Sequence, residues 1–456
     1  MNFSELRQQY PEFEFHAFDV AAKPDALEIT YRFEIKGLCK FEPKWSIPCT
    51  NAEDAFGSST LLRMIFSLGM AELISYWKIT CSPVVRIACG RLTEEQAEWW
   101  KRLYFGGLGE FFYRNGIETD ADSFMQLEFI GSRIPVIPSK KFLSGKLIPV
   151  GGGKDSIVTL NLLKDQLDDA CAFQINHRDS SEQAALLAGI PKARILEPKR
   201  TLDPNMLDCN KRGFLNGHTP FSAIVAFSSV LTAYLHGLKN VILSNESSAS
   251  ESTVSEAEVN HQYSKSYQFE RDFAAYERDY LKSGVRYFSL LRPLTEFQIA
   301  RYFASLTEQY HHIFRSCNAG AKQDKWCGRC AKCLFVAVIL SPFLPYAKIT
   351  ELLDSDIMNL PEMRSVLQEL CGALPNKPFE CVGSRNEVNL ALCLAIARAE
   401  KNGDSLPLLL ADYKASPLYE KYKDLAPAFG QEWDDCHNLP AELAALVKRE
   451  CVERFA

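Results

Sequence analysis

Hydrophobic and polar residues alternate with a period of two near the start of the chain. This period is typical of strands that bury one face and expose the other. The alternation occurs in three segments, residues 13–20, 27–35 and 39–47. Pro24 and Gly37 interrupt it where the chain must turn from one strand to the next. The pattern predicts an antiparallel sheet.

Helical spacing replaces the alternation after the predicted sheet. Apolar residues recur three and four positions apart in segments 59–78 and 93–113, as in helices that bury one face. Thr93 and Gln96 have the spacing of a capping box, which satisfies free backbone N–H groups at the start of a helix. The sheet and these helices together predict a small α+β domain at residues 1–143.

From residue 144 onward, short apolar strands alternate with helices. This order predicts a parallel sheet with right-handed crossovers, and hence an α/β domain at residues 144–345. The strand candidates are residues 147–150, 170–175, 194–196, 241–243 and 285–290. Ligands of such sheets lie at the carboxyl ends of the strands, which nominates Asn176, His177, Ser244, Asn245, Glu246 and Arg292 as binding residues.

Residues 346–456 contain no convincing series of strands. Helical spacing recurs there, for example in segments 361–371 and 387–400. We therefore expect a C-terminal helical region.

One long segment, 214–238, contains no Asp, Glu, Lys or Arg and is long enough to cross a bilayer. It also contains His218, Pro220 and His236, and it leads directly into a predicted strand. These features favour a helix buried behind the sheet over a membrane span.

The composition is that of an ordinary globular protein, with 47% hydrophobic and 24% charged residues among 456. The net charge is −6 and no dense run of Lys and Arg occurs, so the electrostatic signature of nucleic-acid binding is missing. A small-molecule substrate is favoured instead. The chain has 15 cysteines, an odd number, and its N-terminus does not resemble a signal peptide, which predicts reduced thiols and a cytoplasmic location.

A glycine-rich turn lies between the first parallel strand and the following helix. Glycines let the backbone approach an anion closely, and the first turn of a helix directs free N–H groups at it. Lys154 adds a positive charge, Ser156 can donate to a phosphate oxygen, and Asp155 suits a bound cation. The spacing matches neither the Walker pattern nor the dinucleotide fingerprint. We expect a magnesium nucleotide site formed by Gly151, Gly152, Gly153, Lys154, Asp155 and Ser156.

Four cysteines follow the predicted parallel sheet with the spacing C-x9-C-x2-C-x2-C. Two CxxC steps that share a cysteine form a dense group of thiolates suited to Zn²⁺. An iron–sulfur cluster and thiols without metal are the alternatives. The predicted ligands of a structural zinc ion are Cys317, Cys327, Cys330 and Cys333.

Candidate acids and bases lie outside the glycine turn. His261 and Lys265 are four residues apart in a predicted helix and would share one face, although a solvated helix start is the alternative. His218 lies in a turn at the start of segment 214–238, just before its apolar helix, where it could also be an ordinary core histidine. Cys381 precedes a helix whose Ser384 begins a capping box, and a thiol beside a helix N-terminus ionises more readily. An inert buried cysteine is the alternative.

The glycine turn GGGKDS resembles the SGGxDS loop of the ATP pyrophosphatase (PP-loop) superfamily, with Gly151 in the place of the usual Ser. Over residues 146–390 the order of motifs is similar to that of the ATP-dependent UDP-N-acetylmuramoyl-L-alanyl-L-glutamate epimerase family. The motifs that carry this resemblance are VGGGKDS, GFLNGHTPFSA, ILSNESSAS, VNHQYSKSYQFE, YFSLLRPLTE, WCGRCAKC and PFECVG.

The resemblance implies a PP-loop parallel-sheet core and an isomerase of peptidoglycan precursor synthesis. Such an enzyme consumes ATP and Mg²⁺ to invert the terminal L-Glu of UDP-MurNAc-L-Ala-L-Glu, and it releases AMP and diphosphate. The glycine turn would hold phosphates, Asn245 would belong to the nucleotide site, and Asp155 and Glu246 would hold Mg²⁺. His218, His261, Lys265 and Cys381 would compete for the acid and base positions.

Two other functions stay open. A 7-cyano-7-deazaguanine synthase, or another PP-loop adenylating ligase, has a similar loop and a similar cysteine group, but its shared core needs only about half of this chain. A nucleotide-binding regulator without catalysis is the other alternative, and the charged loop beside the histidine-bearing segments argues against it.

Overall fold

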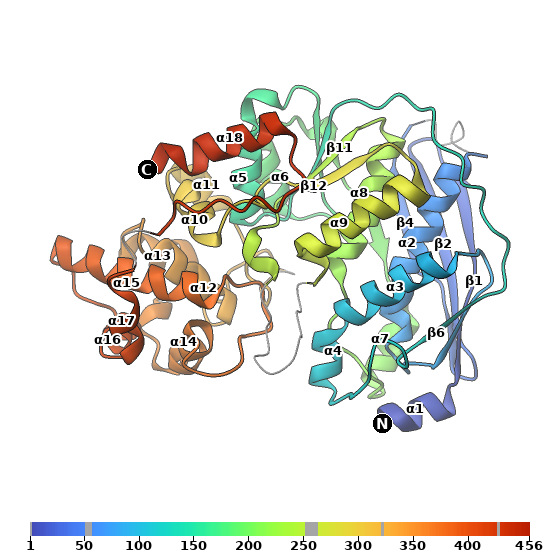
Figure 1. Ribbon diagram of the computed structural model, residues 1–456, viewed down its shortest axis with the longest axis horizontal. Helices are drawn as coiled ribbons and strands as arrows, with labels where there is room; N and C mark the ends of the chain where they lie inside the picture. The colour runs from blue at the N-terminus through green and yellow to red at the C-terminus, as the bar shows by residue number, and fades with distance from the viewer. Residues whose placement is uncertain (1, 51–56, 251–262, 321–322, 426–428) are drawn as a thin grey trace.

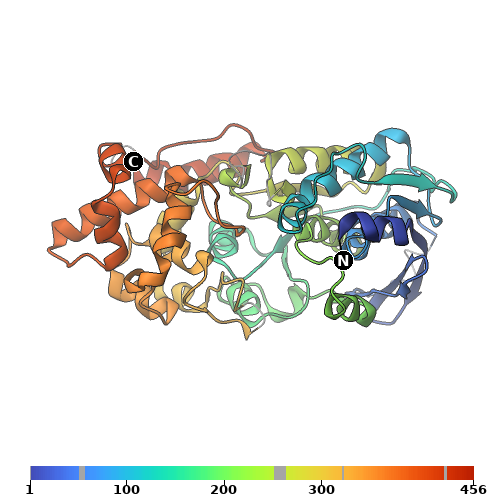
Figure 2. The same ribbon diagram turned by 90° about the horizontal axis from the view of Figure 1, so that it is seen from below.

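The computed structural model describes residues 2–50, 57–250, 263–320, 323–425 and 429–456. It is a mixed α/β structure with two sheets. Figure 1 shows the parallel sheet and its helices, in green and yellow, between an N-terminal sheet in blue and a group of C-terminal helices in orange and red. Figure 2 shows the same order from a second direction.

The predicted N-terminal antiparallel sheet is confirmed. Its strands are β1 (Glu12–Ala22), β2 (Ala26–Ile35), β3 (Cys39–Phe41) and β4 (Lys44–Pro48). In β2 buried residues alternate with more exposed ones along the whole strand, as the sequence pattern requires. The third predicted strand is divided into two, with Pro43 between them. Two short strands that the pattern did not predict extend the sheet in parallel beyond β1, namely β5 (Val84–Ile87) and β6 (Gln126–Phe129).

Helices cover this sheet. They are α1 (Phe3–Gln9), α2 (Ser59–Trp77), α3 (Glu94–Gly107) and α4 (Gly109–Arg114). Nearly every residue of α2 is buried, because it lies between the sheet and α8 (Phe221–Leu235). The capping box of Thr93 and Gln96 at the start of α3 is present as predicted.

The second sheet is entirely parallel, with the strand order β12-β11-β7-β8-β9. Its strands are β7 (Lys146–Pro149), β8 (Ala170–Phe173), β9 (Ile195–Leu196), β11 (Asn240–Leu243) and β12 (Arg286–Ser289). The chain moves outward from β7 to β8 and β9, and then returns to the other side of β7. The strand order therefore reverses between β7 and β11, and such a switch point is where ligands of parallel sheets bind.

Helices α5 (Lys154–Leu162), α6 (Asp179–Leu187) and α9 (Tyr267–Tyr276) connect these strands, together with α8. The predicted buried helix in segment 214–238 is α8, which packs against β7 and β11 on one side and α2 on the other. Within the described ranges, no helix combines the length and the apolar character that a membrane crossing requires.

The two sheets are joined by a short strand, β10 (Lys199–Thr201). It follows β9 in sequence but pairs antiparallel with β4 of the N-terminal sheet. Within this strand, Arg200 Nη2 donates to Glu72 Oε2 on α2 at 2.8 Å, in an ion pair whose carboxylate is fully buried. One continuous hydrophobic core includes residues of both sheets. After β10 comes α7 (Pro204–Lys211).

The described residues after β12 form helices joined by turns and loops, and they contain no strand, as the helical spacing predicts. Its helices are α10 (Glu296–Ala304), α11 (Glu308–Ile313), α12 (Ala331–Leu340), α13 (Tyr346–Leu353), α14 (Arg364–Cys371), α15 (Arg385–Asn402), α16 (Leu408–Lys414), α17 (Pro417–Tyr422) and α18 (Ala441–Cys451). The capping box of Ser384 and Glu387 begins α15. The last helix, α18, returns to pack on α5 and α10.

Candidate active site

The glycine turn lies at the switch point of the parallel sheet, between β7 and α5. Gly152 has φ +76°, and a Cβ atom at this position would lie 2.2 Å from Ser180 Oγ. A Cβ atom on Gly153 would lie 2.7 Å from Ser316 Oγ. The backbone N–H of Arg315 donates to Gly152 O at 2.7 Å. The turn is therefore closely packed from behind, and Gly152 combines this packing with a backbone conformation that favours glycine.

A cavity of about 290 Å³ lies in front of this turn, at the ends of β7 and β11. Gly151, Asn245 and Ser156 line it, as do Arg178 and Arg315, which sequence reasoning missed. Two guanidinium groups beside a glycine turn at a helix start suit an anion with several negative charges. Nothing in the local sequence around these arginines indicated this role, because the fold alone brings them to the cavity.

Three carboxylates meet at one wall of the cavity. Asp155 begins α5, Glu246 follows β11, and Glu296 begins α10. One oxygen of each lies within 4.8 Å of the others. Glu246 and Glu296 are buried, with 6% and 2% of their surfaces exposed. Sequence reasoning missed Glu296, although it ends the motif YFSLLRPLTE.

Lys154 faces these carboxylates. Its side chain is 1% exposed, and its Nζ donates to Asp155 Oδ1 and Glu296 Oε2. Burial would lower the pKa of this ammonium, but the charges of Asp155 and Glu296 outweigh burial and raise it. The ammonium therefore contacts carboxylate oxygens in this structure, and its predicted phosphate contact stays a prediction.

The carboxylates carry more charge than one lysine balances. Burial, with the charges of Asp155 and Glu246, raises the pKa of Glu296 to about 7 despite Lys154. Burial and the charge of Asp155 also raise the pKa of Glu246. Burial acts in the same direction on Asp155, but Lys154 and other cations outweigh it and lower that pKa. Three hard oxygen donors, two of them with raised pKa values, form a donor set that fits Mg²⁺.

A second cavity, of about 310 Å³, adjoins the first. The two share Ser222, Lys265, Asn318 and Cys381 in their walls. Lys265 Nζ lies 3.0 Å from Cys381 Sγ. The charge of Cys381 outweighs the burial of the Lys265 ammonium and raises its pKa.

His218 and Glu110 also line this second cavity. His218 Nδ1 lies 3.3 Å from Glu110 Oε2. The fold thus brings three predicted acid–base residues, His218, Lys265 and Cys381, to one cavity. The fourth, His261, lies outside the described residues. Glu110 was not predicted, because it lies more than a hundred positions before its partner.

The predicted helix around Lys265 needs a correction. The hydroxyl of Ser266 accepts from the backbone N–H of Phe269 and caps α9, which begins at Tyr267. Lys265 therefore lies in a 3-10 turn before the helix, rather than on its face.

The four predicted zinc ligands lie together. Sγ–Sγ distances are 3.9 Å for Cys317 and Cys330, 3.8 Å for Cys327 and Cys333, and 3.5 Å for Cys330 and Cys333. A tetrahedral zinc site with Zn–S bonds of about 2.3 Å has sulfur atoms about 3.8 Å apart, so the four thiols fit this ion. Backbone N–H groups of Gly320 and Cys327 donate to Cys317 Sγ at 3.1 and 3.3 Å.

This cysteine group is linked to Cys381 through Lys332, which lies between Cys330 and Cys333. The Lys332 backbone N–H donates to Glu380 Oε2 at 2.8 Å, and its Nζ donates to the carbonyl oxygen of Cys381. The segment that carries the thiol is thus held by the same turn that carries two of the four cysteines.

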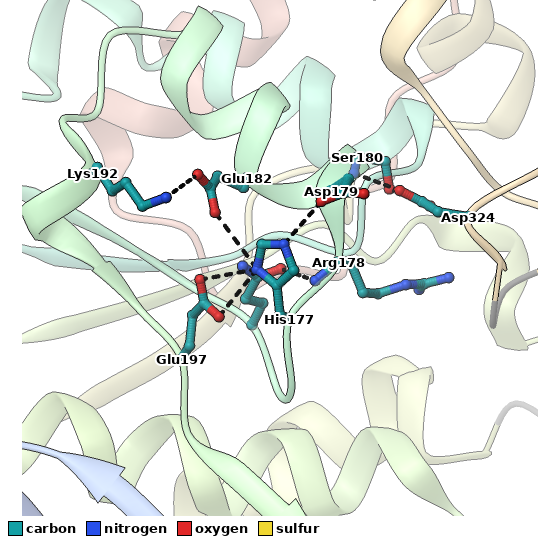
Figure 3. A network of polar contacts seen from close by, with 9 residues as sticks. His177, Arg178, Asp179, Ser180, Glu182, Lys192, Glu197 and Asp324 are labelled. Carbon is teal, nitrogen blue, oxygen red and sulfur yellow. Dashed lines mark hydrogen bonds and ion pairs between the residues drawn. The ribbon is translucent and has the colours of Figure 1, made fainter.

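His177, at the end of β8, belongs to a separate network (Figure 3). Its Nε2 lies 2.9 Å from Asp179 Oδ1 and its Nδ1 lies 3.2 Å from Glu197 Oε2. Hydrogen bonds to Asp179 and Glu197 raise the pKa of this histidine. Figure 3 shows Arg178 extending away from His177, and Arg178 also lines the first cavity.

Comparison with known proteins gives two family matches. The model of the MurL N-terminal domain matches residues 4–290, and that of the MurL C-terminal domain matches residues 313–419. A UDP-N-acetyl-alpha-D-muramoyl-L-alanyl-L-glutamate epimerase from Xanthomonas oryzae pv. oryzae is 33% identical over 79% of this chain and 81% of that protein. Proteins of the same name from Salinispora tropica and a Micromonospora species are 34% and 33% identical over 74% of this chain, which is 74% and 75% of their own lengths. No solved structure matches the chain.

Proposed function

Because this chain belongs to the MurL family, we propose that it is an isomerase that converts UDP-MurNAc-L-Ala-L-Glu to the D-Glu epimer with consumption of ATP. The names of the similar proteins support the epimerisation and the substrate. One structural observation carries the ATP requirement: a cavity suited to a polyphosphate and Mg²⁺ adjoins a cavity lined by a thiol, an amine and an imidazole.

The chemistry of the substrate explains why ATP is needed. Removing the α-proton next to an ionised carboxylate would place two negative charges on one enolate. In the proposed first step, an oxygen of the glutamyl carboxylate attacks the α-phosphorus of ATP and the bond to diphosphate breaks. The resulting acyl adenylate has lost the carboxylate charge, so its α-proton is much more acidic. Hydrolysis after inversion then gives the D-glutamyl product and AMP.

The residues of the first cavity take part in the activation. The backbone of Gly151, Gly152 and Gly153 approaches the phosphates, and Arg178 and Arg315 neutralise their charge. Asp155, Glu246 and Glu296 would hold Mg²⁺, which lowers the charge repulsion between the phosphates and the attacking carboxylate. Lys154 keeps these carboxylates in position. In this proposal the glycine turn acts as a PP-loop.

The proposal is tested with the purified protein, UDP-MurNAc-L-Ala-L-Glu, ATP and Mg²⁺, followed by acid hydrolysis and chiral analysis of glutamate. We expect D-glutamate to form together with AMP and diphosphate, and none of the three to form when ATP is omitted. Inversion without ATP, or AMP release without inversion, would contradict the proposal.

Asp155→Asn tests the position of the activating site. We expect it to abolish diphosphate release, because it removes a charge from the proposed Mg²⁺ ligands. Asp168→Asn is the matched control, since Asp168 is exposed beyond the far end of the same helix. Diphosphate release that persists in Asp155→Asn would remove the activation step from this cavity.

A further inference from the structure

The second cavity lies between two distant parts of the chain. Glu110 belongs to α4, whereas Cys381 belongs to the segment before α15. Tyr113 and Phe379 bring these two parts into contact, with their ring centroids 5.3 Å apart. Arg114 lies over the same Phe379 ring, 5.2 Å from its centroid. The cavity therefore has one wall from the N-terminal half and one from the C-terminal half.

The C-terminal wall holds a thiol beside a cation. Lys265 Nζ lies 3.0 Å from Cys381 Sγ, and an ammonium at this distance stabilises the thiolate. Lys332 Nζ binds the carbonyl oxygen of the same cysteine. The sulfur therefore has a cation beside it and a fixed backbone behind it, as a base that removes a proton from carbon needs.

The N-terminal wall holds an imidazole beside a carboxylate. Glu110 Oε2 lies 3.3 Å from His218 Nδ1, so a carboxylate faces this ring nitrogen. The buried Lys78 fixes the backbone on both sides of this histidine, because its Nζ donates to Gly217 O and to Thr219 Oγ1, the latter at 2.8 Å. An imidazolium held in this way can deliver a proton.

We propose, on the basis of the proposed function, that the glutamyl end of the substrate enters this cavity and that Cys381 and His218 are its two proton carriers. The Cys381 thiolate takes the α-proton of the activated L-glutamyl group, and the electron pair of the Cα–H bond moves to the activated carbonyl. The His218 imidazolium then delivers a proton to the opposite face of Cα. Thiol and imidazole return to their starting states by proton exchange with water.

The two residues are separated experimentally with substrate that carries deuterium at Cα of L-Glu. We expect Cys381→Ala to slow both deuterium loss and D-Glu formation by about 10²–10⁴-fold, the usual contribution of an acid–base group. His218→Gln should slow D-Glu formation equally but still release deuterium from recovered L-Glu, because the thiolate remains. Cys436→Ala and His312→Gln are the matched controls, since both side chains are exposed elsewhere.

Exchange of labelled diphosphate into ATP reports on activation separately from proton transfer. If both variants still exchange diphosphate into ATP and show the expected pattern of deuterium loss, the assignment is supported. Normal deuterium loss in Cys381→Ala, or exchange lost in both variants, would overturn it. The unaltered enzyme could also release deuterium and invert its substrate without exchanging diphosphate into ATP. That result would contradict the adenylation step but not the assignment of the two proton carriers.

Discussion

Replacement of Lys154 by methionine should destabilise the protein strongly. Its ammonium is 1% exposed and contacts two carboxylates, one of which, Glu296, is 2% exposed. Methionine fills a similar volume without the charge. The three carboxylates would then face one another without this buried cation. The free-energy cost of burying their charges would no longer be offset by the attraction to Lys154.

The expected loss is about 3–5 kcal/mol of the free energy of unfolding, as is usual when one partner of a buried ion pair is removed. For a chain of 456 residues that unfolds as a unit, the entropy of unfolding is about 1 kcal/mol/K. The unfolding temperature should therefore fall by about 3–5 °C. Glu296→Gln should lower the free energy of unfolding much less, because it also removes one of the three carboxylates that repel one another.

Thermal and urea unfolding of both single variants and the double variant, without Mg²⁺, measure these effects. The double variant should be more stable than the sum of the two single changes allows, with a coupling of about 0.5–3 kcal/mol. Lys164→Met, at an exposed site just beyond α5, is the matched control and should change stability by about 0.5 kcal/mol or less. Additive effects in the double variant would refute the view that Lys154 is the counterion of this cluster.

Two further predictions concern the C-terminal half. Metal analysis should find one zinc ion per chain, and Cys330→Ser should lower the zinc content. The same variant should slow the alkylation of Cys381 by iodoacetamide, because Lys332 holds the Cys381 segment next to Lys265. An unchanged alkylation rate in zinc-depleted protein would contradict this link. Burial lowers the pKa of His311, so below about pH 6.5 the unfolded chain binds a proton that the folded chain does not. Stability should therefore decrease as the pH falls through this value, by at most about 1.4 kcal/mol per pH unit for this group. His311→Gln should make the decrease shallower, and an identical pH profile of the unfolding temperature would contradict the assignment.

The parts of the fold that could be predicted are those set by local patterns. Alternation gave the N-terminal strands, and helical spacing and capping boxes gave α3 and α15. The parallel strands β5 and β6 were not predicted, since each has only four residues and pairs with strands far away in sequence. Helical spacing predicts that Lys265 lies on a helix, whereas the cap of Ser266 starts the helix only at Tyr267.

The residues of the candidate site likewise fall into those that local sequence predicts and those that only the tertiary structure reveals. The glycine turn and the four cysteines are contiguous or closely spaced, so sequence reasoning could name them. Glu110, Arg178, Glu296 and Arg315 have no local signature of function and reach the two cavities through tertiary structure. Lys154 shows a second limit, because its position in the turn was predictable but the direction of its side chain depended on Glu296.

The strand β10 has a consequence for how such a chain can evolve by recombination. The three residues of β10 belong to the later part of the family's N-terminal domain and complete the sheet formed by its first part. The middle one, Arg200, is the partner of the buried Glu72. A crossover near residue 143 would therefore combine a sheet from one parent with an edge strand and a buried arginine from another. Inheritance of residues 4–290 as one block avoids this mismatch, because both partners of each contact then descend from the same parent.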